Sequence, residues 1–234
     1  MPFDTTTPRT RIDAAGRCAA HGNVVAWCKE SRRMPPTIRL ATAQDANQIQ
    51  AIYAPIVRET PISFEWEPPT PEVMRQRIEQ TLLQFPWLVV EHHGDVLGYA
   101  YASRHRERAS YQWSVDVSVY VHAAARRLGV GRAVYTSLFA ALMVQGFSHA
   151  YAGATLPNPA SVALHESLGF DRIGVYPGVG YKAGRWHDVI WWGLALQPKP
   201  ATPEPPRALP LVRDTPAWQV ALDAGLPDLH RLNP

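Results

Sequence analysis

The chain has 234 residues, a length that fits one well-packed domain with extensions or two small domains. Hydrophobic residues make up 46% and charged residues 18%, as in an ordinary globular protein, and the formal charge of +3 is too small to indicate a nucleic-acid surface. The two cysteines are too few for a zinc site or a disulfide framework. No apolar run reaches the roughly 20 residues of a membrane helix, and no signal-peptide pattern is present. We therefore expect a cytoplasmic protein with no metal, membrane or nucleic-acid partner.

Composition divides the chain into three parts. Residues 1–36 are rich in Thr, Arg and Ala without a sustained period, which predicts a poorly ordered N-terminal extension. Prolines crowd residues 198–234, which predicts an extended Pro-rich tail, with a helical turn or two within Thr215–Leu226. The folded domain is then expected over residues 37–197.

Hydrophobic periodicity within the expected domain predicts strands and helices in the order β-α-α-β-β-β-α-β-α-β-β. In chain order these are a strand over 38–41, a helix that Asp45 caps and Pro55 kinks or ends, a helix that Thr70 caps, strands over 87–92, 96–103 and 113–121, a helix over 129–145, a strand over 149–154, a helix over 160–168, and strands over 171–176 and 188–196. The strands outnumber the helices, and the centre is a meander rather than repeated βαβ units. This order predicts an α+β fold, a sheet covered by helices.

The junction after the strand over 113–121 carries the clearest functional pattern. Residues 126–132 read Arg-Arg-Leu-Gly-Val-Gly-Arg, which has the form R-x-x-G-x-G between a strand and a helix. Glycines let the backbone approach a phosphate, free amides at the helix start point at it, and arginines add charge-assisted hydrogen bonds. The pattern therefore predicts a diphosphate site. A plain glycine-containing helix start with a solvated basic face is the alternative.

A second segment makes the pattern specific. Residues 158–170 run from Asn158 through His165 to Gly169-Phe170, at the expected distance after the first motif. Together the two segments resemble the GNAT superfamily of N-acetyltransferases, and in particular the phosphinothricin and methionine sulfone or sulfoximine acetyltransferases. The resemblance covers about residues 38–196. It implies a central mixed, mostly antiparallel sheet flanked by helices, acetyl-CoA as co-substrate and, as in many members, a homodimer.

The resemblance also assigns the cofactor site. It implies that the backbone of Val119, Tyr120 and Val121 pairs with the pantetheine arm, and that an asparagine, here Asn158, contacts the cofactor. The cofactor-binding residues expected at the diphosphate turn are Arg126, Arg127, Leu128, Gly129, Val130, Gly131 and Arg132.

Two residues are candidates for proton transfer. The resemblance places a glutamate base three residues before the Val119–Val121 segment, where this chain has Asp116, one methylene shorter. Asp116 could act through a water or leave the task to another group, or it could simply line a polar cleft. His165 occupies the position of the group that reprotonates the leaving thiolate, and its alternative is a partly buried structural histidine.

Substrate-binding candidates flank the strand that carries Asp116. Arg106, Arg108 and Tyr111 precede it and suit a substrate carboxylate, although a solvated connection is nearly as consistent with the pattern. Phe64 is expected to line the substrate pocket or to belong to the core.

The sequence thus predicts direct acetyl transfer, in a ternary complex, from acetyl-CoA to the amine of a small amino-acid-like substrate. The alternatives are a GNAT enzyme for another amine (a polyamine, an aminoglycoside or a protein N-terminus) and a non-catalytic acyl-CoA-binding module.

Overall fold

The computed structural model describes residues 35–232, which from Pro36 onward form one compact unit. A seven-stranded sheet has the order β1-β2-β3-β4-β5-β7-β6, and within it only β4 and β5 pair in parallel. The strands are β1 (Thr37–Leu40), β2 (Trp87–His92), β3 (Asp95–Arg104), β4 (Ser114–Val121), β5 (His149–Thr155), β6 (Asp171–Lys182) and β7 (Arg185–Ala195). The predicted N-terminal extension, apart from its last residues, lies outside the described residues.

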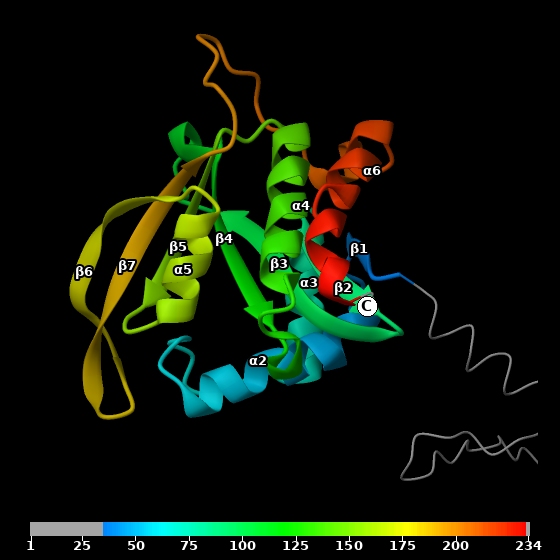
Figure 1. The fold of residues 1–234 in the computed structure, drawn as a ribbon. Coiled ribbons are helices and arrows are strands. Elements are labelled where there is room, and N and C mark those ends of the chain that lie inside the picture. The colour runs from blue at the N-terminus through cyan, green and yellow to red at the C-terminus, as the bar shows by residue number, and fades with distance from the viewer. Residues whose placement is uncertain (1–34, 233–234) are drawn as a thin grey trace, which may run out of the picture. The chain divides into compact units, whose positions relative to one another are not determined.

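Helices cover both faces of the sheet (Figure 1). One face carries α2 (Ala46–Glu59) and α3 (Pro71–Leu82), and the other carries α4 (Val130–Gln145) with α6 (Pro216–Asp223) packed against it; α5 (Pro159–Ser167) follows β5. Neighbouring residues of β2 alternate between the two cores, with Leu88 in the α4 core and Val89 in the α2–α3 core. The predicted α+β fold, a mixed and mostly antiparallel sheet flanked by helices, is confirmed.

Local signals explain most element boundaries. Thr70 caps α3, because its hydroxyl accepts a hydrogen bond from the Val73 amide at 3.3 Å and Pro71 occupies the first helical position. Pro55 does not end α2, as one reading of the sequence had it: the helix continues to Glu59. Its buried face, which includes Ile49 and Val57, extends on both sides of the proline, so tertiary packing outweighs the missing amide.

The last two strands are longer than predicted. β6 and β7 form a hairpin whose turn residues, Ala183 and Gly184, have φ angles of 51° and 79°. Pro177 and nearby glycines interrupt the hydrophobic pattern of β6, which is why the sequence indicated a strand only to residue 176. The hairpin tolerates the proline because β6 is the edge strand of the sheet.

The prediction of an extended tail over residues 198–234 is wrong for its later part. The Arg207 amide donates to the Gln145 carbonyl at 2.8 Å, so the Pro-rich stretch is held by its remaining donors. Thr215 caps α6, as the pattern within Thr215–Leu226 allowed, and the turns of η5 (Leu226–Leu232) follow. Apolar side chains of this segment belong to the α4 core: Leu209, Val212, Trp218, Ala221, Leu222 and Leu229.

We expect Trp218→Ala to destabilise the protein by about 3–5 kcal/mol in urea denaturation, because the indole is buried against α4 and its removal leaves a cavity. The matched control is Val220→Ala on the same helix, where the side chain is 72% exposed and the expected change is below about 0.5 kcal/mol. An equal loss of unfolding free energy in the two variants would show that α6 does not pack into the hydrophobic core.

Candidate active site

The site is built around a fork between β4 and β5. The two strands pair only at Ser114–His149, Val115–Ala150 and Asp116–Tyr151, and then diverge (Figure 1). Beyond Asp116, β4 keeps β3 on its other side as far as Val121. Alternate backbone groups of an antiparallel strand face opposite neighbours. The backbone amides and carbonyls of residues 117–121 that point away from β3 therefore border the fork, where β5 does not pair with them, and are available to a bound molecule.

The predicted diphosphate turn lies at the wide end of this fork. Because β4 and β5 run parallel, α4 and α5, which follow them, begin at the same end of the strand pair. Gly129 adopts a φ of 88°, which favours glycine, and lets the chain enter α4. A side-chain Cβ on Gly131 would lie 3.3 Å from Leu164 of α5 and 3.4 Å from Val121 of β4, so the turn, β4 and α5 meet at this point.

The turn presents free amides to an anion. In the described chain, the first α4 amide with a backbone acceptor is that of Ala133, which donates to the Gly129 carbonyl at 2.9 Å. The preceding amides carry the positive end of the helix dipole. Arg126 and Arg127 are exposed beside them, and the two glycines are partly exposed, so an anion can reach the turn. The geometry fits a diphosphate.

Two contacts refine the predicted cofactor residues. The Arg132 guanidinium donates to the Ser167 hydroxyl at 2.7 Å, so this side chain ties α4 to α5 and only its backbone remains at the turn. The C-terminal segment also reaches the turn: Arg231 donates to the Arg127 carbonyl at 3.0 Å, and a Cβ on Gly129 would collide with the Asp228 carbonyl. Gly129 is therefore required by the packing of η5 as well as by its own backbone conformation.

Asn158 and His165, both on the α5 segment, have different surroundings. Asn158 is half-buried at the start of α5, where its side-chain oxygen accepts a hydrogen bond from the Ser161 amide at 3.2 Å. His165 is only 4% exposed and stacks on Trp192 with the ring centroids 4.9 Å apart. Its Nδ1 donates to the Ser161 carbonyl at 2.8 Å, and its Nε2 accepts from Tyr135 at 3.3 Å.

These contacts bear on the predicted role of His165 in proton transfer, which stays a prediction. Burial lowers the pKa of its imidazole, and both ring nitrogens are engaged inside the core. The structure therefore favours the alternative that the sequence left open, a structural histidine. Helical spacing placed Asn158 and His165 about two turns apart but did not determine which side of α5 packs against β7.

Asp116 lies at the apex of the fork. It belongs to the last residue pair that joins β4 to β5, and its side chain is 27% exposed. Its Oδ1 lies 2.6 Å from Nδ1 of His105, the residue that follows β3. Burial raises the pKa of the Asp116 carboxyl above its ordinary value, and the His105 hydrogen bond and the charges of His105 and Arg106 oppose this shift only in part.

The predicted substrate residues do not form a single group. Tyr111 is 43% exposed, and its ring lies 6.0 Å, between centroids, from that of His105. Arg106 donates to the His105 carbonyl at 2.7 Å, and Arg108 is exposed at the start of the short turn that ends at Tyr111. Phe64 lies elsewhere, packed over Gly180 of β6.

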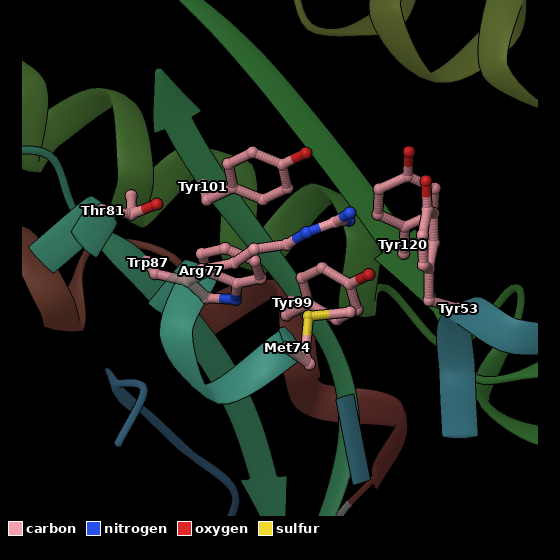
Figure 2. A pocket seen from close by; sticks show the side chains of 8 residues that line it. All are labelled: Tyr53, Met74, Arg77, Thr81, Trp87, Tyr99, Tyr101 and Tyr120. Carbon is pink, nitrogen blue, oxygen red and sulfur yellow. The ribbon is translucent and has the colours of Figure 1, made fainter. Parts of the chain in front are cut away.

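A cavity of about 140 Å³ lies on the same face of β4 as Asp116, between the sheet and the helices α2 and α3. Figure 2 shows the Arg77 guanidinium pointing into it toward Tyr120 and Tyr53. Arg77 forms two hydrogen bonds with Glu65, at 2.8 and 3.1 Å. Sequence reasoning did not single out this cavity, because its lining comes from elements far apart in the chain.

Neither a metal site nor a membrane span is found in the described part of the chain. Residues 35–232 hold no cluster of three or more His, Cys, Asp or Glu side chains suited to a metal ion. None of their helices combines the length and the apolar character that crossing a bilayer requires.

The chain is similar to known acetyltransferases. Residues 38–191 match the acetyltransferase (GNAT) domain family. The phosphinothricin N-acetyltransferase of Streptomyces viridochromogenes is 39% identical over 175 residues, which cover 75% of this chain and 95% of that protein. The L-methionine sulfoximine/L-methionine sulfone acetyltransferase of Salmonella typhimurium is 35% identical over 163 residues, 68% of this chain and 94% of that protein.

A solved relative shares the fold. The crystal structure of a GNAT superfamily phosphinothricin acetyltransferase from Sinorhizobium meliloti in complex with AcCoA matches with a TM-score of 0.68 and 34% identity. The match covers 74% of this chain and 94% of that one. The resemblance stated from the sequence is confirmed. Because the family match spans nearly the whole sheet and both helix starts at the fork, the chain belongs to the GNAT family and is an acetyl-CoA-dependent N-acetyltransferase.

Proposed function

We propose that the chain transfers the acetyl group of acetyl-CoA directly to the amine of a small amino acid of the phosphinothricin or methionine sulfone/sulfoximine type. The observation that carries the proposal is the fork, with a carboxylate at its apex and unpaired amides at its wide end. The substrates named for the relatives from Streptomyces viridochromogenes and Salmonella typhimurium support this substrate class.

The chain's own groups hold acetyl-CoA, whose thioester supplies the activated acetyl group. The amides and arginines of residues 126–132 bind the diphosphate, and Asn158 lies at the neighbouring helix start. The free backbone edge of Val119–Val121 pairs with the pantetheine arm. An amide on this edge is placed to donate to the thioester carbonyl, as an oxyanion donor does.

The apex of the fork supplies proton transfer. An amino-acid amine is mostly protonated at neutral pH and must lose a proton before it attacks. Asp116, with His105 bonded to it, is the titratable pair at the end of the β4–β5 pairing. We assign proton removal to this pair, and we assign His165 a structural role because it is buried against Trp192 and Tyr135.

The substrate enters on the α2–α3 side of the sheet. We propose that Arg106, Arg108 and Tyr111, which are exposed beside the His105–Asp116 pair, bind the substrate carboxylate. Arg77 and the tyrosines of the neighbouring cavity are suited to the polar end of the side chain. Phe64, on the loop before α3, packs over Gly180 of β6, so its predicted role in lining the pocket stays a prediction.

An acetyl-transfer screen tests the proposed function. Thiol release from acetyl-CoA is measured with phosphinothricin, methionine sulfone, methionine sulfoximine, a polyamine, an aminoglycoside and a peptide with a free N-terminus. We expect kcat/KM to be highest for the amino-acid analogues. We expect Asp116→Ala to lower it by a factor of about 100 to 10,000, the usual contribution of a positioned acid or base.

The other outcomes of the screen are equally informative. Preference for the polyamine, the aminoglycoside or the peptide would assign the chain to another substrate class. Tight acetyl-CoA binding without turnover of any amine would indicate a non-catalytic binding module.

The diphosphate turn is tested by binding. We expect Arg126→Gln/Arg127→Gln to raise the Kd for acetyl-CoA by about 10- to 100-fold in calorimetry, which corresponds to a loss of about 1.4–2.7 kcal/mol for the two exposed arginines together. The effect should shrink as salt is added. Arg213→Gln, an exposed arginine of the C-terminal segment, is the matched control and should leave the Kd unchanged. An unchanged Kd in the double variant would place the diphosphate elsewhere.

We also propose that the homodimer implied by the family forms through the β6–β7 hairpin. Apolar side chains on this hairpin are exposed, among them Ile173 at 60%, Val179 at 52% and Trp186 at 67%. An edge strand with such an apolar surface is suited to an interface with a second copy.

We expect Val179→Asp to shift the protein from dimer to monomer in light scattering coupled to size-exclusion chromatography, because a charge buried in an apolar interface is costly. Val220→Asp, which is exposed on α6, should leave the mass unchanged. A wild-type protein that is monomeric at every concentration would contradict the proposed dimer.

A further inference from the structure

The imidazole of His105 bridges the two strands at the apex of the fork. Its Nδ1 lies 2.6 Å from the Asp116 carboxylate of β4. Its ring stacks on Tyr151 of β5, with the ring centroids 4.4 Å apart and the planes inclined by 20°. Asp116 and Tyr151 are the last residues that pair across β4 and β5. The hydrogen bond and the stacking together fix both the place and the plane of the ring.

The same contacts fix which nitrogen is free. A carboxylate can only accept, so the proton between the two groups belongs to Nδ1 when Asp116 is ionised. The lone pair then lies on Nε2, across the ring from Asp116. Nε2 has no hydrogen-bond partner among residues 35–232, and the side chain is 13% exposed. A nitrogen oriented by a carboxylate and left unpaired is suited to accept a proton.

Asp116 by itself is less well placed. Its carboxyl group ends about 1.5 Å short of where a glutamate would reach, and its Oδ1 is already engaged by His105. We propose that His105 is the general base of the acetyl transfer, through Nε2, and that Asp116 is the positioning residue that holds its tautomer. This inference rests on the proposed function and identifies the atom that receives the proton.

The proposed transfer moves one proton to Nε2 and exchanges a carbon–sulfur bond for a carbon–nitrogen bond. Nε2 takes one proton from the substrate ammonium and becomes part of an imidazolium that Asp116 stabilises. The freed amine lone pair forms a nitrogen–carbon bond with the acetyl carbonyl carbon, and the carbon–sulfur bond breaks with its electron pair on sulfur. The second amine proton leaves with the thiol, and the imidazolium returns its proton to water.

The surroundings of His105 set the pH dependence. Burial raises the pKa of the Asp116 carboxyl, so this group takes up a proton at a higher pH than an ordinary aspartate. A protonated Asp116 can donate its own O–H to Nδ1 instead of accepting a hydrogen bond from it, so the carboxyl no longer enforces the tautomer with a free Nε2, and activity falls as the pH falls. The titratable and charged groups that face His105 from β4, β5 and the adjoining loop are Asp116, Tyr151, Tyr111 and Arg106.

The test compares the pH profiles of kcat/KM for the full chain with the best amine of the screen. His105→Gln keeps an amide donor for Asp116 but does not titrate. We expect kcat/KM at pH 7 to fall about 100- to 10,000-fold and to recover as the pH approaches the pKa of the substrate amine, where no base is needed. The KM for acetyl-CoA should stay the same. His149→Gln is the matched control, because this ring lies 6.3 Å from Tyr151 on the same strand and is not bonded to Asp116.

Two results would overturn the assignment. One is a His105→Gln enzyme within threefold of wild type while Asp116→Asn is inactive, which would make Asp116 the base. The other is a weakened His105→Gln enzyme with the wild-type pH profile, which would mean that His105 only supports the fold. A wild-type chain that acetylates no amine would instead overturn the proposed function together with the base, so the two failures are distinguishable.

Ring nitrogen NMR gives a readout that does not need turnover. We expect the wild-type His105 spectrum to show the proton on Nδ1 and a free Nε2, and Asp116→Asn to lose this preference. A wild-type ring with its proton on Nε2 would overturn the proposal even if the variants fail to fold.

Discussion

The active site depends on one constraint in the sheet: β4 and β5 pair over three residues and then separate. Each strand keeps its other neighbour, β3 along β4 and β7 along β5, so the opening costs only the hydrogen bonds between the two. Backbone groups left without a partner away from water are unfavourable unless something binds them. The unpaired stretch is therefore a template for an extended ligand that carries its own donors and acceptors, as the pantetheine arm does.

Parallel pairing places the other parts of the site around this opening. It brings the starts of α4 and α5 to the same end, where Gly129 and Asn158 lie, and leaves Asp116 at the closed end. The proposed sites of anion binding and proton transfer are thus separated along one strand. Neighbouring residues of β4 point to opposite faces of the sheet. Its valines pack in the α4 core, and Asp116, Ser118 and Tyr120 lie on the face that carries α2 and α3.

Much of this could be predicted from the sequence, because the signals are local. The glycines and arginines of residues 126–132 predicted the turn, and strict alternation placed Asp116 on the polar face. His105 was not singled out because its contacts are with Asp116 and Tyr151, which come from other strands, and sequence reasoning selected only its neighbours Arg106 and Arg108. Periodicity gives the spacing of residues on a helix but not the face that packs, so it did not show that His165 is buried against Trp192. The prolines of residues 198–234 predicted an extended tail, and the sequence did not show that Trp218 is buried, because its burial depends on contacts with α4.

The docking of residues 209–232 on α4 affects how the chain can fold during synthesis. α4 buries residues such as Ser137 and Leu138 on two sides, one toward the sheet and one toward α6 and the turns after it. The second side stays uncovered until the ribosome has made residues 209–232, and transiently exposed apolar surface of this kind promotes aggregation and chaperone binding. Completion of the domain is therefore a late event, and α4 keeps an uncovered apolar side while the residues between its end and the C-terminal segment are being made.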